Sequence, residues 1–196
     1  MGRRLRLTRR KSSRRPEPGI QCCRALIVLA EYDPQWPALF EAEAARIQQQ
    51  LGDLARRIEH VGSTAIPGMT AKPVIDIQVS VTSLQPIGVY EERLGSLGYA
   101  HLILDDFDRV YPYFRRPAQW PSTHHVHLCE AGGALEARHI RFRDYLRTHA
   151  DAAAEYVRLK QTLAALHHGE THESRESYSL GKTEFVERVL QLAGWD

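Results

Sequence analysis

The chain has 196 residues, of which 43% are hydrophobic and 26% are charged. This length and composition are typical of a soluble globular protein that forms one domain with a buried core. The formal net charge of +2 is unevenly distributed, because residues 1–24 contain nine Lys or Arg and one acid. The remaining chain has 17 basic and 23 acidic residues, which argues against a nucleic-acid-binding body, and we expect no nucleic-acid partner.

The first 24 residues are rich in Arg, Ser and Pro and have almost nothing to bury. We therefore predict a disordered basic tail over 1–24 and a folded domain over 25–196. The three cysteines, Cys22, Cys23 and Cys129, lack the spacing of a disulfide framework, which fits a reducing, cytoplasmic location. The longest unbroken apolar run, residues 25–30, is too short to span a membrane, and we reject a signal peptide as well.

Hydrophobic periodicity and turn residues predict alternating strands and helices in the first part of the chain. In chain order these are a strand over 24–30, a helix over 37–51, strands over 54–61 and 74–81, a helix over 84–97, and strands over 99–104, 109–115 and 124–130. An acidic turn with Asp105, Asp106 and Asp108 precedes the strand over 109–115. Helices are predicted over 135–148, 151–167 and 177–193. Strands followed by a helical C-terminal half predict an α+β or mixed α/β fold with a mixed central sheet.

The segment of residues 58–81, IEHVGSTAIPGMTAKPVIDIQVSV, contains a glycine turn followed by a strand that carries a carboxylate. Gly62-Ser63-Thr64 can present backbone N–H groups and two hydroxyls to phosphate oxygens, and Asp76 on the strand can hold a divalent metal ion. The glycine and lysine spacing does not fit a Walker A loop. The alternative is that Asp76 caps the turn and that Ser63 and Thr64 serve only turn chemistry.

His125 and His127 lie two residues apart in a predicted strand, so both side chains point to one face. Two imidazoles so placed can bind one metal ion, or His127 can act as a general base; the alternative is that both are packed structural residues. His60 precedes the glycine turn and is a further candidate for the site.

Several basic residues are candidate phosphate ligands, because Arg offers bidentate geometry and Lys a point charge. Alternatively they form solvated helix faces. The candidates are Lys72, Arg141, Arg143, Lys160 and Lys182.

The Gly62-Ser63 turn followed by Asp76 resembles the active-site signature of the nucleotidyltransferase superfamily, which has the polymerase-β-like fold. That signature carries two strand carboxylates, and here Gln78 stands at the second position. In that fold a third acid comes from a later strand, so the resemblance places His127 where this carboxylate would be. We read the resemblance as implying an incomplete two-metal site.

Five further segments resemble the GrpB family (UPF0157) over roughly residues 26–192: YDPQWP at 32–37, IEHVGSTAIPG at 58–68, KPVIDI at 72–77, HVHL at 125–128 and FRDYL at 142–146. Lys182 also fits the family pattern. The resemblance favours Lys182 and Arg143 as phosphate ligands over the other basic candidates. The resemblance implies a nucleotidyltransferase-type fold. Members of this family also occur fused to dephospho-CoA kinases.

Three functions are compatible with these patterns. The first is a protein that binds a nucleotide or phosphorylated small molecule with Mg²⁺ or Mn²⁺, and transfers a nucleotidyl group to an acceptor. The second is an inert module of the same fold that binds a protein partner or assists folding, which the loss of an acid at Gln78 favours. The third is a metal-dependent phosphoesterase.

Overall fold

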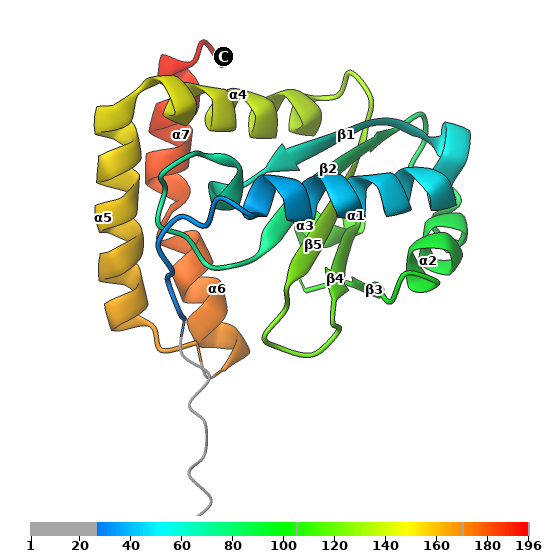
Figure 1. The fold of residues 1–196 in the computed structure, drawn as a ribbon, viewed down its shortest axis with the longest axis horizontal. Helices are drawn as coiled ribbons and strands as arrows, with labels where there is room; N and C mark the ends of the chain where they lie inside the picture. The colour runs from blue at the N-terminus through cyan, green and yellow to red at the C-terminus, as the bar shows by residue number, and fades with distance from the viewer. Residues whose placement is uncertain (1–26, 105, 170, 196) are drawn as a thin grey trace, which may run out of the picture.

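The computed structural model describes residues 27–104, 106–169 and 171–195, and its centre is a five-stranded mixed sheet (Figure 1). The strands are β1 (Ala55–Val61), β2 (Ile75–Val81), β3 (Ala100–Leu102), β4 (Tyr113–Arg116) and β5 (His124–Glu130), in the order β1-β2-β5-β4-β3. β2 and β5 are parallel, whereas the β1–β2, β4–β5 and β3–β4 pairs are antiparallel.

The first face of the sheet is covered by α1 (Trp36–Leu51) and α2 (Ile87–Gly95); Figure 1 shows α1 in front of the strands and α2 to their right. Alternate residues of β2, from Ile75 to Val81, form the main core with Val126 and Leu128 of β5 and with the apolar side of both helices. The intervening β2 residues are Asp76, Gln78 and Ser80, so the polar side chains leave the sheet on the opposite face.

Four helices follow the sheet: α4 (Ala134–Thr148), α5 (Ala150–Leu166), α6 (His172–Leu180) and α7 (Thr183–Leu192). A second apolar cluster joins α4, α5 and α7 to the segment after the glycine turn, with Ile66, Met69, Tyr156 and Phe185 among its members. Figure 1 shows α7 and α6 one above the other beside α5 at one end of the sheet, with α4 running along its edge.

The α+β class, the mixed central sheet and the C-terminal helices are confirmed. Three local predictions are wrong. In the described part of the predicted strand 24–30, there is only an isolated bridge between Ala30 and Ala71. Asp106 and Asp108 belong to a short helix, α3 (Asp106–Val110), and the following strand begins only at Tyr113.

The third wrong prediction is the single helix over 177–193, which the structure divides into α6 and α7. Short 3-10 turns also lie at Gly52–Leu54 (η1) and Ser63–Ala65 (η2). The predicted basic tail lies outside the described residues. Among the helices that the structure describes, none has the length and apolar character needed to cross a bilayer.

Candidate functional site

The candidate site is built on the parallel pairing of β2 with β5. In this register, Asp76 lies opposite His125 and Gln78 lies opposite His127. The side chains of Asp76 and both histidines therefore leave the sheet on the face away from α1. Strand alternation puts His125 and His127 on one face, as predicted, and the pairing of β2 with β5 brings Asp76 to them.

These three side chains form a compact cluster. His125 Nδ1 lies 2.9 Å and His127 Nε2 lies 3.9 Å from Asp76 Oδ1. One ligand atom from each residue lies within 4.8 Å of the others. Burial acts to raise the pKa of Asp76, but hydrogen bonds and charge from the two histidines outweigh it and hold that pKa well below its usual range. The cluster therefore offers an ionised oxygen and two imidazole nitrogens to a metal ion.

The glycine turn packs directly on the Asp76 carboxylate. Gly62 has φ +70°, and a Cβ at this position would lie 2.3 Å from Asp76 Oδ2, closer than any nonbonded contact allows. No backbone N–H of the turn donates to Asp76 among the described residues, so the structure does not support a capping role for this carboxylate. The turn thus contacts the carboxylate without a hydrogen bond, and the partners of the carboxylate are the two histidines.

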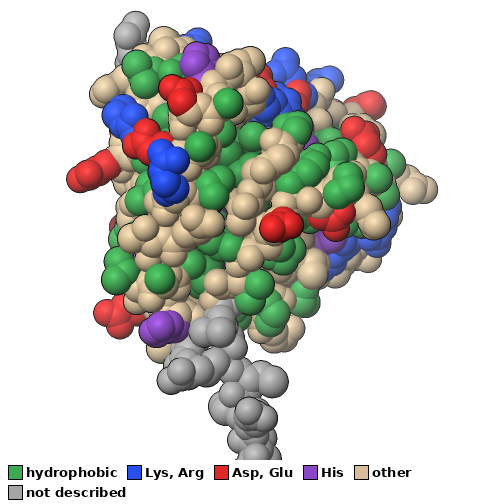
Figure 2. Space-filling view, turned by 60° about the vertical axis from the view of Figure 1, so that its left-hand side comes forward, with side chains coloured by type: hydrophobic (Ala, Val, Ile, Leu, Met, Phe, Trp, Pro, Cys, Tyr) green, Lys and Arg blue, Asp and Glu red, His purple; other side chains and the backbone are tan. Residues whose placement is uncertain are grey.

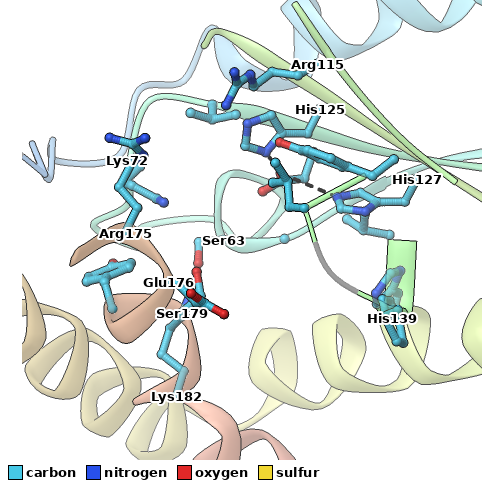
Figure 3. Close-up of a pocket in the computed structure, with 18 of the residues that line it drawn as sticks. Ser63, Lys72, Arg115, His125, His127, His139, Arg175, Glu176, Ser179 and Lys182 are labelled. Carbon is cyan, nitrogen blue, oxygen red and sulfur yellow. Dashed lines mark hydrogen bonds and ion pairs between the residues drawn. The ribbon is translucent and has the colours of Figure 1, made fainter. Parts of the chain in front are cut away.

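A cavity of about 450 Å³ lies between this cluster and the helices α4–α6. Figure 3 shows His125 and His127 on one wall, and Ser63, Ser179 and Lys182 on the other. The described residues that line it include five cations, Lys72, Arg115, Lys160, Arg175 and Lys182, and three acids, Asp76, Asp108 and Glu176. The cavity is thus net positive in a chain whose body is acidic.

Lysine is rare in this chain. Of its four lysines, Lys72, Lys160 and Lys182 all line this one cavity, although they come from three separate segments. Lys160 Nζ donates to Ser63 Oγ at 3.2 Å and to Thr70 O at 2.5 Å. The Nζ atoms of Lys72 and Lys182 lie 4.9 and 4.7 Å from the centre of the Tyr178 ring. Among the described residues no carboxylate forms an ion pair with any of the three.

The lysines disfavour one another's charge. Burial, followed by the positive charge of Lys72, lowers the pKa of Lys160 to about 7 and that of Lys182 to about 7. The pKa of Lys72 is also lowered, chiefly by burial. An anion in the cavity would relieve this repulsion and restore the charged forms.

Gln78, at the place of the second carboxylate, is fully buried and already engaged. Its Oε1 lies 2.8 Å from His139 Nδ1, and its Nε2 donates to the Glu136 carbonyl at 3.4 Å. Gln78 therefore orients His139, whose ring packs 5.6 Å from that of His127, and does not face the cavity as a ligand.

Ser122, His125 and Asp76 form a hydrogen-bonded chain. Ser122 Oγ lies 2.7 Å from His125 Nε2, while His125 Nδ1 faces Asp76. The order matches that of a Ser-His-Asp triad, but Ser122 is only 5% exposed and does not line the cavity. It can accept the Nε2–H bond when Nδ1 faces a metal ion, which is a common support for a metal-binding histidine.

Several predicted residues lie elsewhere. Arg143 donates to Glu59 Oε2 at 2.7 Å and to Asp144 Oδ1 at 2.7 Å, so its charge is neutralised outside the cavity. His60 stacks on Phe40 of α1, with ring centres 4.7 Å apart, and burial lowers its pKa to about 4.

Thr64 and Arg141 are also used structurally. The Thr64 hydroxyl is buried and donates to the Val74 carbonyl at 3.0 Å, so it does not reach the cavity. Arg141 donates to the Gly194 carbonyl near the C-terminus. Of the predicted phosphate ligands, Gly62, Ser63, Lys72 and Lys182 line the cavity, whereas Thr64 and Arg143 do not.

Sequence reasoning missed several residues of the cavity, among them Arg115, Trp120, His139 and Arg175. No local pattern identifies them, because they come from a strand, a loop and two helices that meet only in the fold.

Comparisons with known proteins found relatives that match most of this chain. A family model described as "GrpB protein" matches residues 26–192. The UPF0157 protein BH1888 of Halalkalibacterium halodurans is 36% identical over 171 residues, which are 86% of this chain and 83% of that protein. The crystal structure of the conserved protein GrpB from Enterococcus faecalis matches with a TM-score of 0.72 at 32% identity, and covers 85% of this chain and 96% of that one. A dephospho-CoA kinase of Mycolicibacterium paratuberculosis is 33% identical over 165 residues, which are 72% of this chain and 40% of that enzyme.

Proposed function

The chain belongs to the GrpB family, and we propose that its cavity binds a nucleotide or another phosphorylated small molecule together with a divalent metal ion. The observation that carries this proposal is that two groups of residues face each other across one cavity, one suited to a metal ion and one suited to phosphate. Asp76, His125 and His127 form one wall, and Ser63 with Lys160 and Lys182 forms the other. A phosphorylated ligand is the class of molecule that uses both walls, because its oxygens can bind a metal ion and ammonium groups at once.

The donor set favours Mn²⁺ over Mg²⁺. Mg²⁺ prefers oxygen ligands in strict octahedral geometry, whereas two imidazoles and one carboxylate suit Mn²⁺ and the later transition metals. The spread of up to 4.8 Å between ligand atoms requires a small closing movement around an ion, since metal–nitrogen bonds measure about 2.1 Å. A bound ion would neutralise phosphate oxygens at this wall of the cavity.

Nucleotidyl transfer is the reaction that this arrangement would support if the protein is catalytic. In that reaction an acceptor hydroxyl attacks the α-phosphorus and loses its proton to a base or to solvent. The bond between the α-phosphorus and the oxygen that bridges it to the β-phosphorus breaks, and pyrophosphate leaves. Lys160 and Lys182 would hold the departing phosphates, while Asp76 and His127 would hold the metal beside the reacting group. A relative named as a dephospho-CoA kinase supports a setting in which phosphorylated ligands are handled.

One observation favours a second candidate, a binding module without catalysis. The amide of Gln78 is occupied by His139 and the Glu136 carbonyl, so a second strand carboxylate is missing and nothing replaces it at that position. A two-metal reaction would then lack one of its supports.

The first experiment is thermal unfolding of the purified full chain with ATP, CTP, GTP or UTP, each with and without Mn²⁺ or Mg²⁺. A ligand that binds only the folded state stabilises it by about 2.7 kcal/mol at one hundred times its Kd. We expect a rise in Tm that needs both a nucleotide and a metal and that disappears in Asp76→Asn.

Asp53→Asn is the matched control, because Asp53 is exposed on η1 and lies outside the cavity. It should keep the full response. If no nucleotide–metal pair raises Tm in the wild-type protein, the nucleotide proposal fails and the partner-binding module becomes the better explanation.

A further inference from the structure

The cavity has a second group of cations that the proposed function leaves unused. Arg115 lies on β4, opposite His125 in the antiparallel register, so its side chain shares the face of the metal-ligand cluster. Arg175 comes from α6, and Lys72 comes from the segment before β2. Figure 3 shows Arg115 beside His125, at the end of the cavity away from Lys182.

Two of these cations, Arg175 and Lys72, lie over the ring of Trp120. The guanidinium carbon of Arg175 lies 5.2 Å from the centre of the Trp120 ring, and Lys72 Nζ lies 5.7 Å from it. Cation–π contacts of this kind hold positive side chains in place, and Arg175 Nη1 also donates to the Gly169 carbonyl at 2.9 Å. The loop that carries Trp120 therefore positions two cations that line the cavity.

Arg115 is incompletely satisfied. Its Nη2 donates to the Ala118 carbonyl, but its Nε is buried and has no hydrogen-bond partner among the described residues. A buried donor without a partner is costly, and more so on a charged group. The positive charge of Arg115 also acts, after burial, to lower the pKa of Arg175. An anion bound between these side chains would relieve the repulsion between the two guanidinium charges.

We propose that Arg115, Arg175 and Lys72 form a second anion subsite, which binds a carboxylate or phosphate group of the acceptor that shares the cavity with the nucleotide. The proposal rests on the proposed function in assigning the anion to an acceptor. The guanidinium fork of Arg115 fits the two oxygens of such a group. Its position opposite His125 places the acceptor beside the metal-ligand cluster, where its hydroxyl or other nucleophile can reach a phosphate held by Lys160 and Lys182.

The test is calorimetric titration of the metal-free full chain with inorganic phosphate and, separately, with succinate. We expect two phosphate-binding events in the wild-type protein. Arg115→Gln should raise the Kd of one event at least about tenfold and leave the other unchanged, and Lys182→Gln should do the reverse. Succinate that competes only at the Arg115-dependent event identifies a carboxylate acceptor, whereas phosphate binding without such competition identifies a phosphorylated one.

Arg175→Gln provides a second variant should Arg115→Gln fail to fold, and it should weaken the same event. Arg158→Gln is the matched control, because Arg158 is exposed on α5 and lies outside the cavity. A single phosphate event that Lys182→Gln abolishes and Arg115→Gln leaves intact overturns the second subsite. An Arg115-dependent event in a protein that shows no nucleotide–metal stabilisation supports the subsite and rejects the nucleotide assignment instead.

Discussion

At the scale of single residues, the site depends on one backbone conformation and one close contact. Gly62 combines a positive φ with direct contact to Asp76, and both properties require the absence of a Cβ. The contact keeps the turn against the carboxylate while both histidines bind its other side. The turn and the proposed metal ligands are therefore one unit, and a change in the turn should affect the ligands.

Gly62→Ala tests this unit. The new Cβ would displace the Asp76 carboxylate and strain the backbone, so we expect a loss of about 2 kcal/mol in the free energy of unfolding and loss of the metal-dependent rise in Tm. Gly68→Ala is the matched control, because Gly68 also has a positive φ, +75°, but faces open space. It should cost about 1 kcal/mol and keep the metal response. Equal metal responses in the two variants would contradict the role of the Gly62 contact.

The lysine pKa values give a pH dependence with a definite sign. Lys160 and Lys182 have a pKa of about 7 in the folded protein, against about 10.4 in the unfolded chain. Between these values the unfolded chain binds more protons, so the stability contributed by each lysine rises as pH increases from about 7 to about 10. The difference in unfolding free energy between the wild type and Lys182→Met should therefore change with pH in this window, whereas that for Arg158→Met should stay constant. Urea denaturation from pH 6.5 to 9 measures both, and parallel curves for wild type and Lys182→Met would contradict the lowered pKa.

At the scale of elements, the break between α6 and α7 is what brings Lys182 into the cavity. A Cβ on Gly181 would lie 2.5 Å from Leu163 Cδ2 of α5, so the chain approaches α5 closely at this point. Lys182 follows at once as the residue before α7, and its side chain turns toward Tyr178 and the cavity. The packing of α5 against the break therefore decides where a proposed phosphate ligand lies.

Gly181→Ala should show this coupling. The backbone at Gly181 is compatible with Ala (φ −59°), so a change in an exposed helix would stabilise the protein by about 0.5–1 kcal/mol. Contact with Leu163 should cancel this gain and weaken phosphate binding by displacing Lys182. Gly95→Ala in α2 has no such neighbour and should show the full gain. Chemical denaturation measures the effect of Gly181→Ala on the free energy of unfolding in the wild type and in Leu163→Ala. In Leu163→Ala the cost of adding Gly181→Ala should disappear. If the effects of the two changes are fully additive, the contact with Leu163 is not the cause.

The same elements show how far sequence reasoning reaches. The helix ending at Leu51 and the strands β1, β2 and β5 were predicted because each has a local hydrophobic period and a clear turn at its end. The division of α6 from α7 falls at Gly181, where the chain comes close to Leu163 of α5, and the helical periodicity on both sides of this glycine concealed it. Likewise, the strand alternation predicted one shared face for His125 and His127, but only the parallel pairing of β2 with β5 brings Asp76 to them. The positions of Arg115 and Arg175 depend wholly on tertiary structure.

At the scale of the whole molecule, the site lies where two separately packed layers meet. One core lies between the sheet and α1 and α2, whereas the second joins α4, α5 and α7. The metal-ligand cluster belongs to the sheet, and Lys160, Lys182 and Arg175 belong to the helical layer. Figure 2 shows basic and acidic side chains interspersed on the face that carries α5, in contrast to the excess of cations inside the cavity. A ligand held by both walls would therefore bridge the two layers.

Hydrogen–deuterium exchange should detect this bridge. With Mn²⁺ and the nucleotide that raises Tm, we expect slower exchange in α6 and at the start of α7, because these segments carry the anion ligands and lie away from the main core. Helix α2 packs on the opposite face of the sheet, so the exchange rates of its amides should change little. In Asp76→Asn the same ligands should leave α6 unprotected, since the wall on the sheet is lost. Uniform protection across the chain, or protection of α6 that persists in Asp76→Asn, would mean that the ligand does not link the two layers through the Asp76 cluster.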